Sequence, residues 1–337
     1  MKVPKYGRAL LLGVIASLLA IYFIASQMND VGKMWTALRS ADYRWILVSM
    51  GIIVIGLFAR GARWRALLDG ALPFWRSFSI TNVSYLLSGV LPLRLGEVAR
   101  VYLAMQAQPP VPAMKSISTI LVERLIDLLS VLLILALALS GGPLPDQLRA
   151  TATFVIPVVV IGFMVLIFLA SQRAFTLRLA GQIFAKIPVL QRWNLLGWLE
   201  QFLDGLKPLT QPSALAQVIP FTIASWLCSL GSGYVLMIAF FGHGDWATTC
   251  LFSAAASLAV AVPAVPGNLG TYELSIMLAL GAMGYGEPAA TATAFAIAVH
   301  AVNLLVNSTL GVYGFIQEGI SLDQLSHGVR EMRKPSG

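Results

Sequence analysis

Residues 77–105 read SFSITNVSYLLSGVLPLRLGEVARVYLAM, a hydrophobic stretch long enough to cross a membrane that is interrupted around Pro92 and Gly96. Proline removes a backbone donor and clashes with the preceding helical turn, and glycine lets the backbone bend. The stretch therefore predicts two half-helices joined by non-helical backbone. Such backbone is tolerated at membrane depth only where protein or a watery cavity covers its polar groups.

A second hydrophobic stretch, residues 246–283, is interrupted in the same manner by VPAVPGNLG at 262–270. Around both breaks the chain is hydrophobic: 58% of its 337 residues are hydrophobic and only 11% are charged, whereas a soluble protein carries about 25% charged residues. We expect six full spans, since runs of about 20 apolar residues cross hydrocarbon as helices. They are residues 8–27, 44–60, 117–140, 151–170, 214–241 and 289–316.

The net charge of +8 arises from basic residues in loops between apolar runs, which indicates membrane topology rather than nucleic-acid binding. Loop 60–76 and segment 171–212 are both basic and should lie in the cytoplasm. Both stay there only if the broken stretches dip into the membrane and return. We therefore predict two re-entrant hairpins, the first entering from the cytoplasm and the second from outside, with both termini cytoplasmic.

This order of elements predicts an all-α polytopic membrane protein with an internal inverted repeat. A first helix (8–27) precedes repeat 1 (44–140), and repeat 2 (214–316) precedes a cytoplasmic tail (317–337). The intervening residues 151–212 comprise a connecting helix and an interfacial segment at the cytoplasmic surface. Inverted repeats with discontinuous helices in matching positions point to a transporter's binding site; chance similarity between the two breaks is the alternative.

Polar side chains occupy costly positions in two of the expected spans. Glu123, Arg124 and Asp127 lie together in 117–140, and a charge at the centre of a membrane helix costs about 2.5–3.5 kcal/mol on insertion scales. They form either a site or an internal ion pair that only holds helices together. His300 and Asn303 share a face of 289–316, where interhelical hydrogen bonding is the alternative to a proton-relay role.

The residues at the breaks suggest an anion site. Glu97 and Glu273 each lie in the first turn of a half-helix that begins after a glycine, and Arg94 and Arg100 flank the first of them. Two half-helix N-termini with arginines would suit a phosphate headgroup. The simpler explanation of the two glutamates is that they complement the helix dipole. Asn82 and Tyr85 follow a helical face that leads into the first break.

The sequence contains no Walker A loop, no HExxH and no GxSxG motif. It has three histidines and two cysteines, which are not clustered, so we expect no metal and no cofactor.

Three motifs resemble the transmembrane domain of lysylphosphatidylglycerol synthases and its stand-alone, flippase-like relatives. They are NVSY with LPLRLGEVAR at 82–100, ERLID at 123–127 and PGNLGTYE at 266–273. The resemblance covers about residues 8–320 and implies a bacterial inner-membrane protein that translocates lipids. The chain ends at Gly337, so we expect no lipid aminoacylation.

The leading hypothesis is therefore a transporter and not an enzyme, which moves an anionic phospholipid or a lipid-linked phosphate between leaflets. An intramembrane enzyme, with Glu123 or Asp127 as general base, and an accessory protein that assembles enzymes of lipid synthesis are the alternatives. Membrane lipids are the expected partners. The candidate substrate-binding residues are Asn82, Tyr85, Arg94, Gly96, Glu97, Arg100, Glu123, Arg124, Asp127, Gly267, Gly270, Thr271, Glu273, His300 and Asn303.

Overall fold

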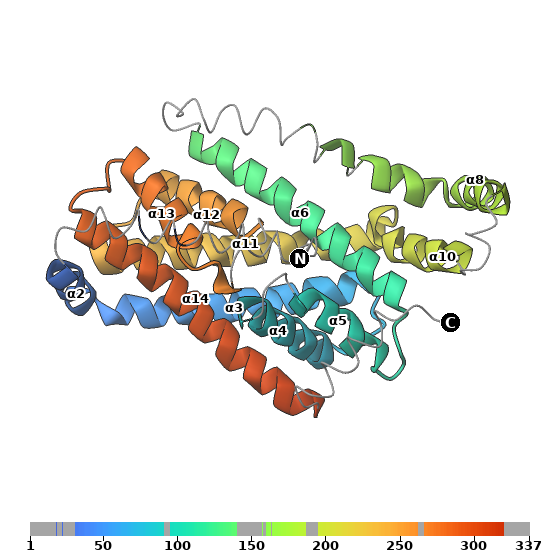
Figure 1. Cartoon of the computed structure of the whole chain (residues 1–337), viewed down its shortest axis with the longest axis horizontal. Helices are drawn as coiled ribbons and strands as arrows, with labels where there is room; N and C mark the ends of the chain where they lie inside the picture. Colours follow the sequence, from blue (N-terminus) through green and yellow to red (C-terminus); the bar gives the residue numbers. More distant parts are fainter. Residues whose placement is uncertain are drawn as a thin grey trace, which may run out of the picture.

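The computed structural model describes residues 18, 22, 31–90, 95–139, 157, 160–162, 164–186, 195–261 and 266–319. This part of the chain is helical, as predicted, and is drawn in Figure 1. Its α-helices are α2 (Val31–Ser40), α3 (Tyr43–Leu67), α4 (Phe74–Val90), α5 (Leu95–Met105), α6 (Ala113–Leu139), α8 (Arg173–Lys186), α10 (Leu195–Leu206), α11 (Pro212–Phe241), α12 (Trp246–Ala261), α13 (Thr271–Ala282) and α14 (Ala289–Glu318). Two 3-10 turns, η2 (Lys207–Leu209) and η3 (Pro266–Asn268), complete the list.

Three of the described helices, α3, α11 and α14, are long and apolar enough to cross a membrane, and a bent pair at 160–182 makes a fourth candidate. The protein is therefore a multi-pass membrane protein. The expected spans 8–27 and 151–170 fall largely outside the described residues, and so does Arg94. The described helices do not settle the number of spans, so the count of six stays a prediction.

Two long central helices, α3 and α11, run antiparallel and side by side (Figure 1). The Asp42 N–H at the start of α3 donates to the Ala239 carbonyl near the end of α11 at 3.0 Å. Further along, the hydroxyls of Ser49 and Ser232 share a hydrogen bond of 2.8 Å. The helix α3 continues to Leu67, beyond residue 60 where the sequence analysis ended it. Its last two turns, which the sequence analysis placed in a loop, are helical.

The helices α4 and α5 fold back on each other. Arg76 near the start of α4 donates to the Gln106 carbonyl just after α5 at 3.4 Å. The crossing is tight because a Cβ on Gly96 would overlap the Ser84 carbonyl oxygen. Glycine is therefore required at the start of α5, so that the two half-helices can approach closely.

A second pair, α12 and α13, also returns to its starting end, where His243 before α12 hydrogen-bonds the Tyr285 hydroxyl after α13 at 3.1 Å. The turn between them places Gly267 in the left-handed region at φ 69°. A Cβ on Gly267 would lie 3.2 Å from the carbonyl oxygen of Gly89 near the end of α4. The residues that flank the two breaks, Gly89 and Gly267, therefore lie against each other.

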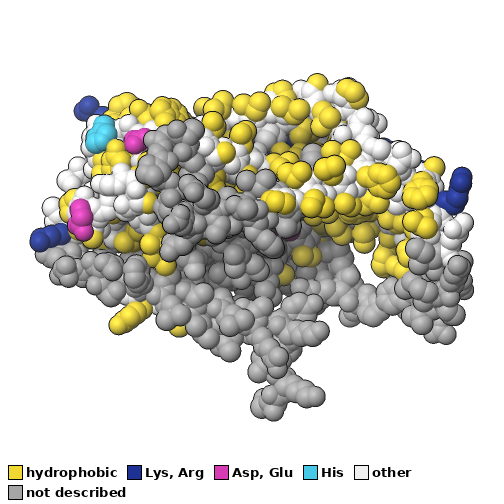
Figure 2. All heavy atoms as spheres, turned by 90° about the horizontal axis from the view of Figure 1, so that it is seen from above, with side chains coloured by type: hydrophobic (Ala, Val, Ile, Leu, Met, Phe, Trp, Pro, Cys, Tyr) yellow, Lys and Arg dark blue, Asp and Glu magenta, His cyan; other side chains and the backbone are white. Residues whose placement is uncertain are grey.

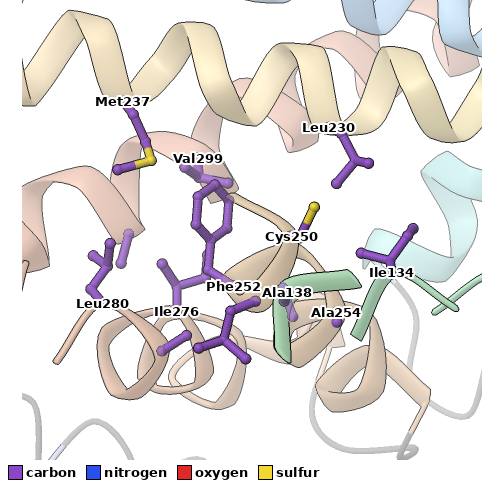
Figure 3. Packing of buried hydrophobic residues seen from close by; sticks show 14 of the residues in the cluster. Ile134, Ala138, Leu230, Met237, Cys250, Phe252, Ala254, Ile276, Leu280 and Val299 are labelled. Carbon is purple, nitrogen blue, oxygen red and sulfur yellow. The ribbon is translucent and has the colours of Figure 1, made fainter. Parts of the chain in front are cut away.

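Each hairpin packs against a long helix from the other part of the chain: α4 against α14, and α12 against α6. The α4–α14 contact depends on small residues, because a Cβ on Gly314 would lie 2.7 Å from the Ser79 carbonyl oxygen and one on Gly311 would overlap Leu86. The contact between α12 and α6 is filled by aliphatic and aromatic side chains. Figure 3 shows Phe252 of α12 among residues of α6, α11, α13 and α14.

The outer surface is suited to lipid. In Figure 2, Lys and Arg side chains lie at the two ends of the described surface, and hydrophobic side chains cover much of what lies between. Large apolar side chains point outward from several helices, among them Leu47, Ile55, Leu133, Leu278 and Ile316. An exposed apolar surface of this extent is expected where lipid replaces water.

The glycine contact between α4 and α14 predicts a steric effect on stability. We expect Gly311→Val to lower the free energy of unfolding in detergent by about 1–3 kcal/mol, since the added side chain meets Leu86 and the Asn82 carbonyl. Gly51→Val is the matched control, because nothing lies within 4 Å of a Cβ there. Equal melting curves for the two variants would contradict this packing.

Candidate functional site

The carboxylate of Glu123 lies at the centre of a buried ionic network. Arg100 of α5 binds it with both terminal nitrogens, at 2.8 and 3.3 Å. Arg63 of α3 approaches the same carboxylate at 3.3 Å and holds Asp127 of α6 with two hydrogen bonds of 2.7 and 3.1 Å. Because α3, α5 and α6 each supply a charge, the network ties the first broken hairpin to two long helices.

This part of the network is dry. The Arg63, Arg100 and Glu123 side chains are at most 1% exposed. The Arg100 guanidinium also lies 4.1 Å from the centre of the Trp64 ring, whose indole N–H donates to Thr119 at 3.3 Å. A buried charge is stable only if it is paired and hydrogen-bonded. These three side chains are positioned to support the site rather than to meet a ligand.

A second group of charges borders the dry network and is accessible. The Arg124 Nε donates to Glu97 at 2.9 Å, and these side chains are 34% and 26% exposed. Asp127 is 22% exposed although Arg63 binds it. Among the carboxylates and arginines of this network, these are the groups that a ligand or water can reach.

The second broken hairpin carries a matching pair. Glu273 in the first turn of α13 accepts from the Gly270 N–H at 2.7 Å and pairs with the His300 Nδ1 of α14 at 2.6 Å. The Tyr272 ring lies 4.5 Å from the His300 ring. Glu273 precedes its partner by 27 residues, the same separation as Glu97 from Arg124. In both hairpins the second half-helix is therefore fixed by a carboxylate that binds a basic side chain on the next long helix.

The other candidate residues are placed as follows. Asn82 is buried and donates to the Phe78 carbonyl in its own helix, and Asn303 likewise donates to Val299. The Thr271 hydroxyl donates to the Asn268 carbonyl. Tyr85 lies beneath the guanidinium of Arg60, 5.7 Å from the ring centre. The structure thus brings Glu97, Arg100, Glu123, Arg124 and Asp127 together and gives the two asparagines local roles.

Sequence reasoning missed Arg60, Arg63 and Trp64, because the helix was ended too early and the arginines were assigned to a loop. The signal was present: the three residues follow an uninterrupted apolar run at spacings that share one helical face. Among the described residues, no group of three His, Cys, Asp or Glu side chains can hold a metal ion.

This fold and this network define a class: multi-pass helical membrane proteins with broken hairpins and paired charges in their interior. The family described as Lysylphosphatidylglycerol synthase TM region matches residues 10–311, and the chain belongs to it. The resemblance noted from the motifs is confirmed. No solved structure matches the chain.

A curated relative is "Glycosyltransferase AglD" of Haloferax volcanii, which is 24% identical over 363 residues. The alignment covers 96% of this chain and 56% of the relative, so the chain spans little more than half of that protein. The expectation that the chain is not an enzyme is contradicted by the name of this relative. Absence of familiar catalytic motifs was the reason for that expectation, and it is a weak reason for a site inside a membrane.

The dry network predicts a large effect of neutralising its centre. We expect Glu123→Gln to lower the free energy of unfolding by about 3–5 kcal/mol, because Arg100 loses its carboxylate and stays buried. The control is Glu200→Gln, which breaks an exposed pair with Arg173 and should cost less than about 1 kcal/mol. Thermal unfolding in detergent measures both. Equal melting temperatures for the two variants would show that Glu123 does not hold the helices together.

Proposed function

We propose that the chain moves an anionic lipid, a phospholipid or a lipid-linked phosphate, between the leaflets of the bacterial inner membrane. The observation that carries the proposal is the contact between the residues that flank the two breaks, Gly89 against Gly267, in a helix bundle that also holds accessible charges. Ionisable groups and irregular backbone are costly at membrane depth and typically mark a substrate pathway. A lipid headgroup needs such a polar path, and its acyl chains can remain in the bilayer.

The proposal includes two halves of opposite orientation, residues 44–140 and 214–316, that move against each other. The contacts in one half have counterparts in the other: α4 with α5 and α12 with α13, α5 with α6 and α13 with α14. The equal separation of the pairs Glu97–Arg124 and Glu273–His300 supports the same assignment. Repeats of this kind alternate access by rocking around a fixed site.

A proposal for topology follows from the charges at the ends of the helices. Five basic residues, Arg65, Arg76, Lys115, Arg173 and Lys207, lie at the end of the described molecule where α4 starts and α5 ends, against three, Lys33, Arg39 and Arg44, at the other end. Basic residues concentrate on the cytoplasmic side. We therefore assign this end to the cytoplasm and the end with His243 and Tyr285 to the outside. The first hairpin is then re-entrant from the cytoplasm and the second from the outside.

The second candidate function is glycosyl transfer to or from a lipid-linked carrier, and the name of the Haloferax volcanii relative is the observation that favours it. Asp127 and Glu97 are accessible carboxylates of the kind that act as general bases. A covalently altered lipid after incubation with a nucleotide sugar and a polyprenyl phosphate, detected by mass spectrometry, would establish this function.

Translocation is tested with purified protein in liposomes that contain headgroup-labelled phosphatidylglycerol and an impermeant quencher. We expect the wild type to raise the flipped fraction. Arg124→Gln should slow the flip rate about tenfold or more, because an accessible charge-assisted bond is lost. Arg178→Gln on α8, an exposed residue, is the control and should flip at the wild-type rate. Wild-type rates equal to empty liposomes for a broad lipid panel would end the proposal.

The topology is tested with single cysteines in a background without Cys228 and Cys250. Gln211→Cys, at the exposed start of α11, should be shielded from a membrane-impermeant thiol reagent in intact cells, whereas Lys33→Cys on α2 should react. Permeabilised cells serve as the control, where both positions should react. Labelling of position 211 in intact cells would reverse the assignment.

A further inference from the structure

Arg60 differs from the other arginines of the interior. It is half-buried on α3, donates to the Ser229 hydroxyl of α11 at 3.2 Å and lies over the Tyr85 ring of α4. Arg63, Arg100 and Arg124 each bind a carboxylate. No carboxylate of the described residues forms an ion pair with Arg60. Among these residues, four arginines accompany the three carboxylates of Glu97, Glu123 and Asp127, so one positive charge is left over.

The Asp127 carboxylate does not form an ion pair that neutralises the Arg60 guanidinium. Asp127 acts on Arg60 from a distance, but both of its oxygens are bound by Arg63. The Glu273 oxygens of the second hairpin are held by His300 and by the Gly270 N–H. A guanidinium without a counter-ion is costly in a medium of low dielectric constant. Its position therefore favours a negatively charged ligand.

Side chains from two further helices lie against this guanidinium. The Ser229 hydroxyl of α11 accepts from Arg60 and donates to the Ser225 carbonyl, and the Tyr85 ring of α4 lies 5.7 Å from the guanidinium. Arg60, Ser229 and Tyr85 are all only partly buried. The remaining N–H groups of Arg60 can therefore bind a phosphate with two parallel hydrogen bonds.

The depth of Arg60 in the helix bundle favours a phosphate group that belongs to a lipid over a free phosphate ion. At 1.5 Å per residue, Arg60 lies about 25 Å along α3 from Tyr43 and about 10 Å from its other end at Leu67. This places the guanidinium within the helix bundle and beside both hairpins. We propose that Arg60, positioned by Ser229 and Tyr85, binds the phosphate group of the lipid during its passage. The proposal rests on the proposed function for the identity of the ligand as a lipid.

A protection experiment tests the site in the wild-type protein. Phenylglyoxal modifies accessible arginines, and peptide mass spectrometry quantifies the adduct on Arg60 and on Arg65, which is exposed on the same helix. Farnesyl phosphate, added to the protein in detergent, should reduce the Arg60 adduct several-fold and leave Arg65 unchanged. No protection of Arg60 overturns the site. Equal protection by inorganic phosphate at the same concentration keeps the anion site and overturns its assignment to a lipid.

A variant series measures the contribution of the guanidinium. Arg60→Gln should weaken binding of farnesyl phosphate about tenfold or more, since a bidentate charge-assisted contact is lost. Arg60→Lys should recover part of the affinity because it keeps the charge but not the fork. Arg65→Gln is the matched control and should bind as the wild type does. Wild-type affinity in Arg60→Gln overturns the proposal.

The outcomes also separate this site from transport. If the wild type binds farnesyl phosphate through Arg60 but flips no lipid in liposomes, the site stands and the proposed function fails. If the wild type flips lipid and Arg60→Gln flips and binds equally well, the function stands and the site is elsewhere. Melting curves without ligand identify a misfolded variant, in which case the protection experiment in the wild type decides.

Discussion

The structure depends on keeping charged side chains paired where water is excluded. The Glu123 carboxylate, 1% exposed, is shared by Arg63 and Arg100. Removing one partner of a buried ion pair leaves an uncompensated charge, which costs more than the pair ever contributes. Since the three side chains come from α6, α3 and α5, satisfying them fixes a half-helix of only 11 residues between two long helices.

The charges of the first half divide into dry and accessible ones. Glu123 and Arg100 are enclosed, whereas Arg124, Glu97 and Asp127 are about a quarter to a third exposed and can respond to a ligand. The dry pairs need to be rigid, because the accessible groups are held by the same helices. A loosely held arginine would lose its orientation, and with it the bidentate geometry that phosphate recognition requires. In the proposed function, the dry pairs hold the helices and the accessible charges meet the lipid headgroup.

The sequence predicted the helical membrane fold, both breaks and the first cluster, because proline, glycine and buried charge are strong local signals. It missed Arg60 and Arg63, since hydropathy ends a span at the first charges although a helix can continue while its charged face turns inward. Gly311 and Gly314 were missed for another reason. Their role is decided by the backbone of α4 that faces them, and no local pattern encodes which helix becomes the neighbour.

The two hairpins are matched in geometry but not in chemistry. Arg124 presents a guanidinium that has donors and no acceptor, and it binds Glu97 through its Nε and a terminal nitrogen. His300 presents a smaller imidazole ring, of which only the Nδ1 faces Glu273. The Gly270 N–H holds the other oxygen of Glu273, so backbone replaces the second nitrogen that arginine supplies in the first hairpin. The two hairpins therefore use the same carboxylate with different partners, and an account of the protein that treats its halves as equivalent fails at this pair.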